Sequence, residues 1–470
     1  MKRFYLLMIG VLCSIVLLAQ QPKYIFYFIG DGMGVNAVTL TEMYMAELQG
    51  RIGIEPLCMT QFPYSGQLRT FSASHSITDS SAAGTCLASG KKTTNHMEGV
   101  TPDGSPAVSV AEKLKQEGWA VGVSTSVSIN HATPGAFYAH VESRSDYYHI
   151  GQQLTQSNYD FFAGGTFINP NNKNNADDPN LYDMAEQEGY VIARGYADFL
   201  TKQDAPKMIL LQPNEGLDKN KAGGGCLPRS FGRDEDALTL AQIVEAGIMS
   251  LSRNEKFFLM VEAGQIDMAA HSNDAATVID DMLEMNKAVQ VAYDFYLQHP
   301  DETLIVITAD HETGGLTLGV GSSSLKLKLL QNQKVTSDTL NEHITNLCEQ
   351  YGKRLKWEQV KQVLTQDFGF YAGIEITPEE DAALRKQFVI MQKGKDKSVK
   401  TLYSEIKQLS NAALKLINKK AKVGWITTSH TANPVPVFAV GVGAERFAGW
   451  HDNSEVAPTI HKLATGKVME

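Results

Sequence analysis

The chain has 470 residues, of which 43% are hydrophobic, and it carries a formal net charge of −10 at pH 7. This length and this hydrophobic content are sufficient for one large core or for two domains. The acidic charge, and the lack of any run of Lys and Arg interleaved with aromatic residues, argue against nucleic acid as the main partner.

The first residues, 1–19, have the pattern of a secretory signal peptide. Lys2 and Arg3 form the positive region, residues 4–18 the apolar region, and Leu17 and Ala19 the cleavage site. The apolar stretch of about 15 residues is shorter than the roughly 20 that span a bilayer, and no later stretch is long and apolar enough to do so. We therefore expect an exported protein, periplasmic or secreted, without a membrane span after cleavage.

Between residue 20 and about residue 320, short apolar runs alternate with segments of helical periodicity. A stretch at 169–180 is rich in Asn, Asp and Pro and is predicted to be a surface loop, and a Gly-rich link is predicted at 222–225. The alternation is typical of an α/β protein and predicts a three-layer α/β/α sandwich around a central, mainly parallel sheet. The strands are predicted at 24–29, 120–124, 257–261 and 304–309, and the helices at 105–117 and 237–251.

Residues 325–422 have a different composition, rich in Lys, Gln and Glu. Thr377, Pro378 and Glu380 have the residue types favoured at the N-cap, N1 and N3 positions of a helix. Residues 399–420 carry apolar side chains at roughly helical spacing, and the strand pattern resumes only at Trp425. We therefore predict a helical insertion near the active site, which is either a surface excursion or a lid over the site.

Several apolar runs end directly in carboxylates and imidazoles. Parallel strands gather ligands beyond their carboxyl ends, so these side chains are expected to converge in one crevice. Asp, Glu and His together suit zinc with a harder ion beside it. The residues concerned are Asp31, Glu262, Asp267, His271, Asp310, His311 and His430.

A nucleophile is predicted in the segment 77–85, where Ser80 precedes small residues and a helical pattern. A helix N-terminus favours an anion, because its backbone N–H groups are free and its dipole is positive. A serine hydroxyl becomes a nucleophile when its pKa falls, which a zinc ion achieves by coordination. Taken alone, the segment is also typical of an ordinary helix cap, and Ser81 is a rival nucleophile.

Three further residues fit the same chemistry. Arg144 can bind two phosphoryl oxygens with its planar guanidinium, which Lys cannot match. Thr133 offers a hydroxyl to a hard cation. Asp267 and His271 are four residues apart, so one helical turn would place both on one face toward one metal.

Six stretches of the chain together resemble the alkaline phosphatase family, and they occur in the order found in that family. The resemblance covers nearly the whole mature chain outside the insertion, so residues 20–470 are predicted to form one catalytic domain. It implies hydrolysis of small phosphate monoesters to an alcohol and inorganic phosphate, and related enzymes are often dimers, which implies a homodimer. The stretches are Gly30-Asp31-Gly32-Met33-Gly34, Thr78-Asp79-Ser80, His131-Ala132-Thr133-Pro134 with Arg144, 262–267 with His271, Thr308-Ala309-Asp310-His311-Glu312, and Ser429-His430-Thr431.

The resemblance also implies two zinc ions (Zn2+), a third metal, taken as magnesium (Mg2+), and a phosphoserine intermediate on Ser80. Arg144 and the metals would neutralise the phosphoryl oxygens, and the first zinc would stabilise the leaving group and activate water. The implied ligands are Asp267, His271 and His430 for the first zinc, Asp31, Asp310 and His311 for the second, and Glu262, Thr133 and a second oxygen of Asp31 for magnesium.

The chain departs from some bacterial members of the family at two positions. They have an aspartate before the Ala-Thr-Pro stretch and a lysine after the zinc-binding aspartate, where this chain has His131 and Met268. Met268 removes a charge that could help to hold phosphate or water on magnesium. His131 is either a metal ligand or a hydrogen-bonding residue just outside the ligands, so the identity of the third metal stays open.

Other readings of the same residues remain. A phosphodiesterase of the same superfamily is the main alternative, although such enzymes generally lack the glutamate of the third site that Glu262 supplies here. A sulfatase would need a proline two residues after its nucleophile, where this chain has Ala82. A non-enzymatic protein that sequesters zinc or phosphate is a third reading. The natural substrate, the oligomeric state and the pairing of Cys58, Cys86, Cys226 and Cys348 are left open.

Overall fold

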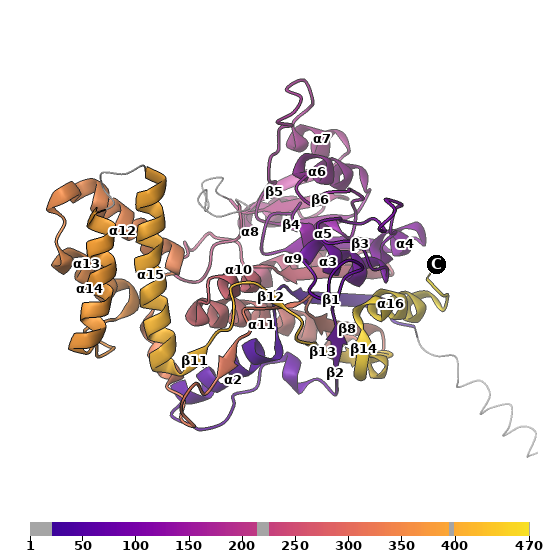
Figure 1. Ribbon diagram of the computed structural model, residues 1–470. Coiled ribbons are helices and arrows are strands. Elements are labelled where there is room, and N and C mark those ends of the chain that lie inside the picture. Colours follow the sequence, from indigo (N-terminus) through magenta and orange to yellow (C-terminus); the bar gives the residue numbers. More distant parts are fainter. Residues whose placement is uncertain (1–20, 214–224, 394–398, 470) are drawn as a thin grey trace, which may run out of the picture.

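The computed structural model in Figure 1 describes residues 21–213, 225–393 and 399–469. The predicted signal peptide lies outside these residues, as does most of the predicted Gly-rich link. Within the described ranges, no helix has the length and apolar character needed to cross a bilayer. The stretch 169–180 contains neither helix nor strand, which confirms the predicted loop.

A ten-stranded sheet forms the centre of the molecule, and seven adjacent strands in it run parallel. In spatial order these are β8 (Thr303–Thr308), β1 (Tyr24–Gly30), β7 (Phe257–Ala263), β3 (Ala120–Thr125), β4 (Phe161–Gly164), β6 (Met208–Leu211) and β5 (Val191–Arg194). Beyond β8, the sheet continues with β13 (Val435–Gly441), which is antiparallel to both neighbours, then β2 (Tyr64–Arg69) and β14 (Gly449–Asp452). The predicted mainly parallel sheet is confirmed.

Helices cover both faces of this sheet. Consecutive side chains of β1 point to opposite faces, so Phe26 and Tyr27 each contact a different helical layer. Phe26 packs edge-on against Phe295 of α11 (Ala275–Gln298). On the other face, the Tyr27 hydroxyl donates a hydrogen bond to the backbone oxygen of Leu87 in α3 (Ser80–Ser89). The helix α11 packs with α2 (Val35–Leu48) and α9 (Leu240–Leu251), and α3 packs with α4 (Val110–Gln116), α5 (Ala132–Gly135) and α16 (Val456–Thr465). The sheet between these two layers is the predicted α/β/α sandwich (Figure 1).

The register of the central strands brings the predicted ligands to one edge of the sheet. Ile29 of β1 lies opposite Glu262 of β7 and opposite Thr308 of β8. The chain therefore reaches Asp31 and Asp310 two residues further on, at the same carboxyl edge. This convergence follows from parallel pairing, because all three strands end at one level.

The block predicted as an insertion is mainly helical in its described part. It lies between β10 (Thr317–Leu318) and β11 (Val423–Gly424), which pair with each other and so bring the two ends of the block together. Its longer helices, orange in Figure 1, are α12 (Ser337–Tyr351), α13 (Trp357–Phe368), α14 (Pro378–Lys393) and α15 (Val399–Ala421). The predicted start of α14 is confirmed, because Glu380 N donates to Thr377 Oγ1 at 3.3 Å and Thr377 N donates to the Glu380 carboxylate at 3.0 Å.

Two predicted helices begin later than expected. The helix predicted from residue 105 begins at Val110, because Ser109 and Glu112 form a reciprocal capping box there. The helix predicted from residue 237 begins at Leu240, where Thr239 and Gln242 form a second box. The expected starts were wrong because they followed the hydrophobic pattern rather than these capping residues.

The expectation that the run before His430 is a strand of the sheet was also wrong. Residues 425–429 form no strand, Ile426 is largely exposed, and the backbone N–H groups of Ile426 and Thr427 bond to the carbonyl of Gly314. His430 lies instead in the two-residue strand β12 (His430–Thr431), which pairs antiparallel with β9 (Glu312–Thr313). This local pairing, rather than the end of a sheet strand, brings His430 to the site.

Candidate active site

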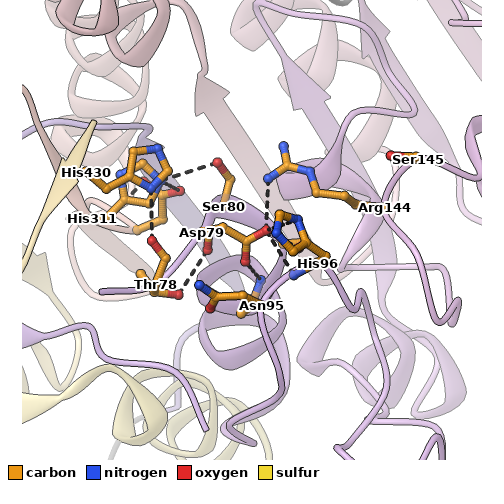
Figure 2. Close-up of polar contacts among 12 residues, drawn as sticks. Thr78, Asp79, Ser80, Asn95, His96, Arg144, Ser145, His311 and His430 are labelled. Atoms are coloured by element: carbon orange, nitrogen blue, oxygen red, sulfur yellow. Dashed lines mark hydrogen bonds and ion pairs between the residues drawn. The ribbon is translucent and has the colours of Figure 1, made fainter. Parts of the chain in front are cut away.

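Ser80 is the first residue of α3, and its hydroxyl faces a histidine. The helix is capped by Asp79, whose Oδ1 accepts a hydrogen bond from Ala82 N at 3.1 Å. Ser80 Oγ lies 3.3 Å from His311 Nε2, as Figure 2 shows. Ser81, by contrast, donates its hydroxyl to Asp79 Oδ2 at 2.9 Å. The two neighbouring serines are thus distinguished, because only Ser80 is directed toward the imidazoles.

Arg144 reaches the same place from the other side and is anchored by Asp79. Its Nη1 donates to Asp79 Oδ2 at 3.2 Å, and the backbone N–H of His96 donates to the same oxygen at 3.1 Å (Figure 2). Burial alone would raise the pKa of Asp79, but the charge of Arg144 and several hydrogen bonds lower it below its ordinary value. Asp79 is therefore ionised near neutral pH and holds the guanidinium in the site.

A first cluster of ligand atoms is formed by Asp31, Asp310 and His311. His311 Nε2 lies 3.1 Å from Asp310 Oδ2 and 3.5 Å from Asp31 Oδ1, and all three side chains are buried. Asp310 Oδ1 accepts hydrogen bonds from Gly32 N and His311 N. Apart from these close approaches of His311 Nε2, which do not have hydrogen-bond geometry, Asp31 Oδ1 and Asp310 Oδ2 have no partner in the described part of the chain. These two oxygens are free to bind a cation.

A second cluster is formed by Asp267, His271 and His430. As predicted from their spacing, Asp267 and His271 share a face of α10 (Gln265–His271), with Oδ2 and Nε2 3.2 Å apart. His430 Nε2 lies 3.7 Å from Asp267 Oδ1 and 3.1 Å from His271 Nε2. The Nδ1 atoms of the two histidines bond to the carbonyls of Thr428 and Thr78, so both Nε2 atoms are turned to one point.

The two clusters adjoin each other through His311. Ligand atoms of Asp267, His311 and His430 all lie within 4.8 Å of one another, and the rings of His311 and His430 are stacked with centroids 3.5 Å apart. The compact groups are therefore Asp267–His311–His430 and Asp31–Asp310–His311. His271 lies at the outer side of His430 and is the more exposed of these histidines.

A third group of oxygen atoms surrounds Glu262. Thr125 donates its hydroxyl to Glu262 Oε2. Glu262 Oε1 and Thr133 Oγ1 are buried and have no partner among the residues described. The Glu262 carboxylate is close enough to Asp31 to contribute to the raised pKa of Asp31. The donor atoms of this group are all oxygens, which suits magnesium.

The pKa shifts of these side chains reflect burial and the crowding of carboxylates in the site. Burial and the neighbouring Asp310 raise the pKa of Asp31 well above its ordinary value, and burial raises the pKa of Glu262 to about 8. A hydrogen bond with Asp267 raises the pKa of His271 to about 9. Burial, followed by the charge of His311, lowers the pKa of His430 to about 4. Buried carboxylates with free oxygens need a cation to ionise, so the donor set fits metal ions.

A cavity of about 640 Å³ opens over Ser80, and residues from distant parts of the chain line it. His131 and Met268, the two departures from the expected pattern, both line it. His131 Nδ1 is buried without a partner in the described chain, and burial, followed by Arg144, lowers the pKa of His131 to about 4. The helical block contributes Thr336, Ser337, Asp338 and Lys407, so it reaches the cavity that contains the serine.

The structure brings all the predicted site residues to this edge of the sheet: Asp31, Ser80, His131, Thr133, Arg144, Glu262, Asp267, His271, Asp310, His311 and His430. Sequence reasoning assigned no role to Asp79, Thr125 or Thr313. Thr313 donates its hydroxyl to Asp267 at 2.5 Å and so orients that carboxylate. Asp79 was detectable as the N-cap directly before Ser80, whereas Thr125 and Thr313 carry no local signal.

Comparisons with known proteins agree with this geometry. The family model described as alkaline phosphatase matches residues 22–465. Alkaline phosphatase 4 of Bacillus subtilis (strain 168) is 33% identical over 460 residues, which are 95% of this chain and 90% of that protein. The crystal structure of a cold-active alkaline phosphatase from Shewanella sp. has a TM-score of 0.76 at 29% identity, covering 94% of this chain and 99% of that one.

A more distant structure shares the fold. A mutant of the alkaline phosphatase from the Antarctic bacterium TAB5, solved with magnesium bound, is 23% identical, with a TM-score of 0.64 and coverage of 95% of this chain and 99% of that chain. The family model spans nearly the whole chain, and the described fold matches that of the Shewanella enzyme. The chain therefore belongs to the alkaline phosphatase family, whose members are hydrolases of phosphate monoesters.

Proposed function

We propose that Ser80 is the nucleophile of a two-step phosphate monoester hydrolysis. In the first step, Ser80 Oγ forms a bond to phosphorus while the bond to the ester oxygen breaks, and the alcohol leaves with a proton. In the second, water attacks the phosphoserine and gives up a proton, the bond between Oγ and phosphorus breaks, Oγ takes up a proton, and inorganic phosphate leaves. The observation that carries this proposal is the 3.3 Å contact of Ser80 Oγ with His311, at a helix N-terminus among buried carboxylates.

Arg144 is proposed to bind the transferred phosphoryl group. Its guanidinium lines the cavity beside Ser80, and Asp79 fixes its position. The free N–H groups at the start of α3 add a partial positive charge on the same side of the substrate. These groups would bind the phosphoryl oxygens most strongly where negative charge accumulates during transfer.

We further propose two zinc ions and one magnesium ion as cofactors. Asp267, His271 and His430 would hold one zinc, with His311 adjoining, and Asp31, Asp310 and His311 the other. Glu262, Thr133 and Asp31 would hold magnesium. When bound, these ions supply Lewis-acid stabilisation of the attacking and leaving oxygens. Support comes from the unpartnered oxygens of Asp31, Asp310, Glu262 and Thr133 and from the mixture of imidazole and carboxylate donors.

The broader role follows from the same premises. Small-molecule phosphate monoesters are the proposed substrates, and the leader pattern supports export to the periplasm or the medium. The helical insertion is proposed to act as a lid, because its residues line the cavity above Ser80. A homodimer is proposed from the family alone. The phosphodiesterase alternative is not favoured by any feature of the site.

Replacement of Ser80 with Ala tests the nucleophile, with Ser81→Ala as the matched control. S80A should lose nearly all hydrolysis of 4-nitrophenyl phosphate while its zinc content, measured by mass spectrometry, stays at the wild-type level. S81A should retain most activity. An acid quench during turnover should trap phosphate on the peptide that contains Ser80. Wild-type-like turnover of S80A would refute the mechanism, and a higher kcat/KM for bis(4-nitrophenyl) phosphate would identify a diesterase instead.

A further inference from the structure

A second cavity adjoins the one that contains Ser80. Its volume is about 480 Å³, within the range of small-molecule binding sites. The two cavities share His271, Ser272, Ser337, Asp338 and Lys407 in their linings. They therefore adjoin each other at this boundary, so the second cavity lies next to the one that would hold a substrate at Ser80.

One face of α15 forms a wall of the second cavity and is rich in lysine. Lys407, Asn411, Lys415 and Lys419 follow one another at intervals of four residues, so they lie along one stripe of the helix, and all four line the cavity. The three lysines make no ion pair with any residue that the structure describes, whereas the next lysine, Lys420, is paired with Glu380 at 2.7 Å.

The charge in this cavity is consequently positive. Asp338 is the one carboxylate among its lining residues in the described chain, against three ammonium groups. An ordinary solvated helix face usually pairs its lysines with acidic residues at i−4 or i+4. Here none of the residues three or four positions away from Lys407, Lys415 or Lys419 is acidic. These three ammonium groups would attract an anionic group, although the charge of Lys419 also acts on Glu380 of α14.

Two buried amides complete the lining. Asn341 of α12 and Asn418 of α15 are each 4% exposed, and each has an Oδ1 atom without a hydrogen-bond partner in the described structure. Asn418 is held in place by its Nδ2, which donates to Asn273 O at 2.7 Å. Both oxygens are shielded from solvent, so these amides belong to the wall of the cavity and do not present acceptors to a bound molecule.

We propose that this second cavity binds the leaving group of substrates that carry a second anionic group, as sugar bisphosphates do. The inference rests on the proposed function, because the second cavity only matters to a leaving group if the monoester is cleaved at Ser80. The ammonium groups of α15 would hold the second anion.

The test compares three six-carbon phosphate esters related to glucose. Glucose 6-phosphate has a neutral leaving group, 6-phosphogluconate adds a carboxylate, and glucose 1,6-bisphosphate adds a phosphate. Each kcat/KM is divided by that for glucose 6-phosphate, with allowance for the two phosphates of the bisphosphate. The variants are the triple replacement of Lys407, Lys415 and Lys419 with Ala, the triple replacement with Arg, and Lys386→Ala as control. Lys386, in α14, is exposed and lines neither cavity.

In the wild type, we expect at least one anionic substrate to exceed glucose 6-phosphate by tenfold or more, and high salt to reduce this preference. The triple Ala variant should reduce the ratio at least fivefold, while the Arg and Lys386→Ala variants keep it. The substrate with the raised ratio shows whether phosphate or carboxylate is bound. A wild-type ratio near unity, or a ratio that triple Ala leaves unchanged, overturns the inference. Failure of the wild type to cleave 4-nitrophenyl phosphate would instead refute the proposed function.

Discussion

The ion pair between Asp79 and Arg144 gives a sharp prediction about how the phosphoryl group is held. Asp79→Asn keeps the size of the side chain, and Asn is as good an N-cap as Asp, so α3 should still begin at Ser80. It removes the charge that accepts the 3.2 Å bond from Arg144 Nη1. A hydrogen bond to a charged group contributes about 1.5–3 kcal/mol.

If all of that energy serves to orient the guanidinium, kcat/KM for 4-nitrophenyl phosphate should fall by about 10- to 100-fold, since each 1.4 kcal/mol is a factor of ten. The inhibition constant for inorganic phosphate should rise in parallel, because the same guanidinium binds the product. Ser81→Ala is the matched control, because it removes a different bond to the same Asp79 oxygen and leaves Arg144 in place.

A double-mutant cycle decides whether Asp79 acts through Arg144. Arg144→Ala alone should lower kcat/KM more than Asp79→Asn does, on the order of 100-fold or greater. The kcat/KM of the double variant should be no lower than that of Arg144→Ala, because Asp79 acts on the substrate only by positioning Arg144. Additive losses would refute the reasoning, as would an Asp79→Asn variant with normal activity. A large fall in its melting temperature would point to a role of the carboxylate in folding rather than in substrate binding.

Three further predictions concern the metals. In metal-free protein, the raised pKa values of His271 and Glu262 contribute stability that is present at low pH and is lost as pH rises through about 8 to 9. The free energy of unfolding should therefore decrease between about pH 6.5 and 9.5. A flat pH profile of this free energy, measured by chemical denaturation, would contradict the prediction. Chelation of the wild type should lower the melting temperature, since a ligand at 100 times its Kd stabilises the folded state by about 2.7 kcal/mol. Added zinc should restore the melting temperature. An unchanged melting curve would exclude a structural contribution of the metals. Glu262→Gln should shift the magnesium dependence of activity to higher concentrations with little change in zinc content, and equal loss of both ions would show that Glu262 supports the whole site.

Local sequence determined much of this protein. Strands β1, β7 and β8 were predictable because strands covered on both faces must be apolar throughout, and their parallel pairing places Asp31, Glu262 and Asp310 at one edge. The position of Ser80 at a helix start and the shared face of Asp267 and His271 are properties of single helical turns. Each of these features depends on residues only a few positions apart, which is why the pattern of residue types is sufficient to predict them.

Other features were decided by contacts between distant segments. His430 reaches the site through the pairing of β12 with β9, which is more than a hundred residues away in sequence. The strand predicted before His430 was wrong because the local sequence carries no signal for that pairing. The anchoring of Arg144 by Asp79 and the opening of Lys407 onto the cavity likewise depend on how loops and helices close over the sheet. Periodicity records which face of an element is buried, but the partner of that face is chosen by packing of the whole chain.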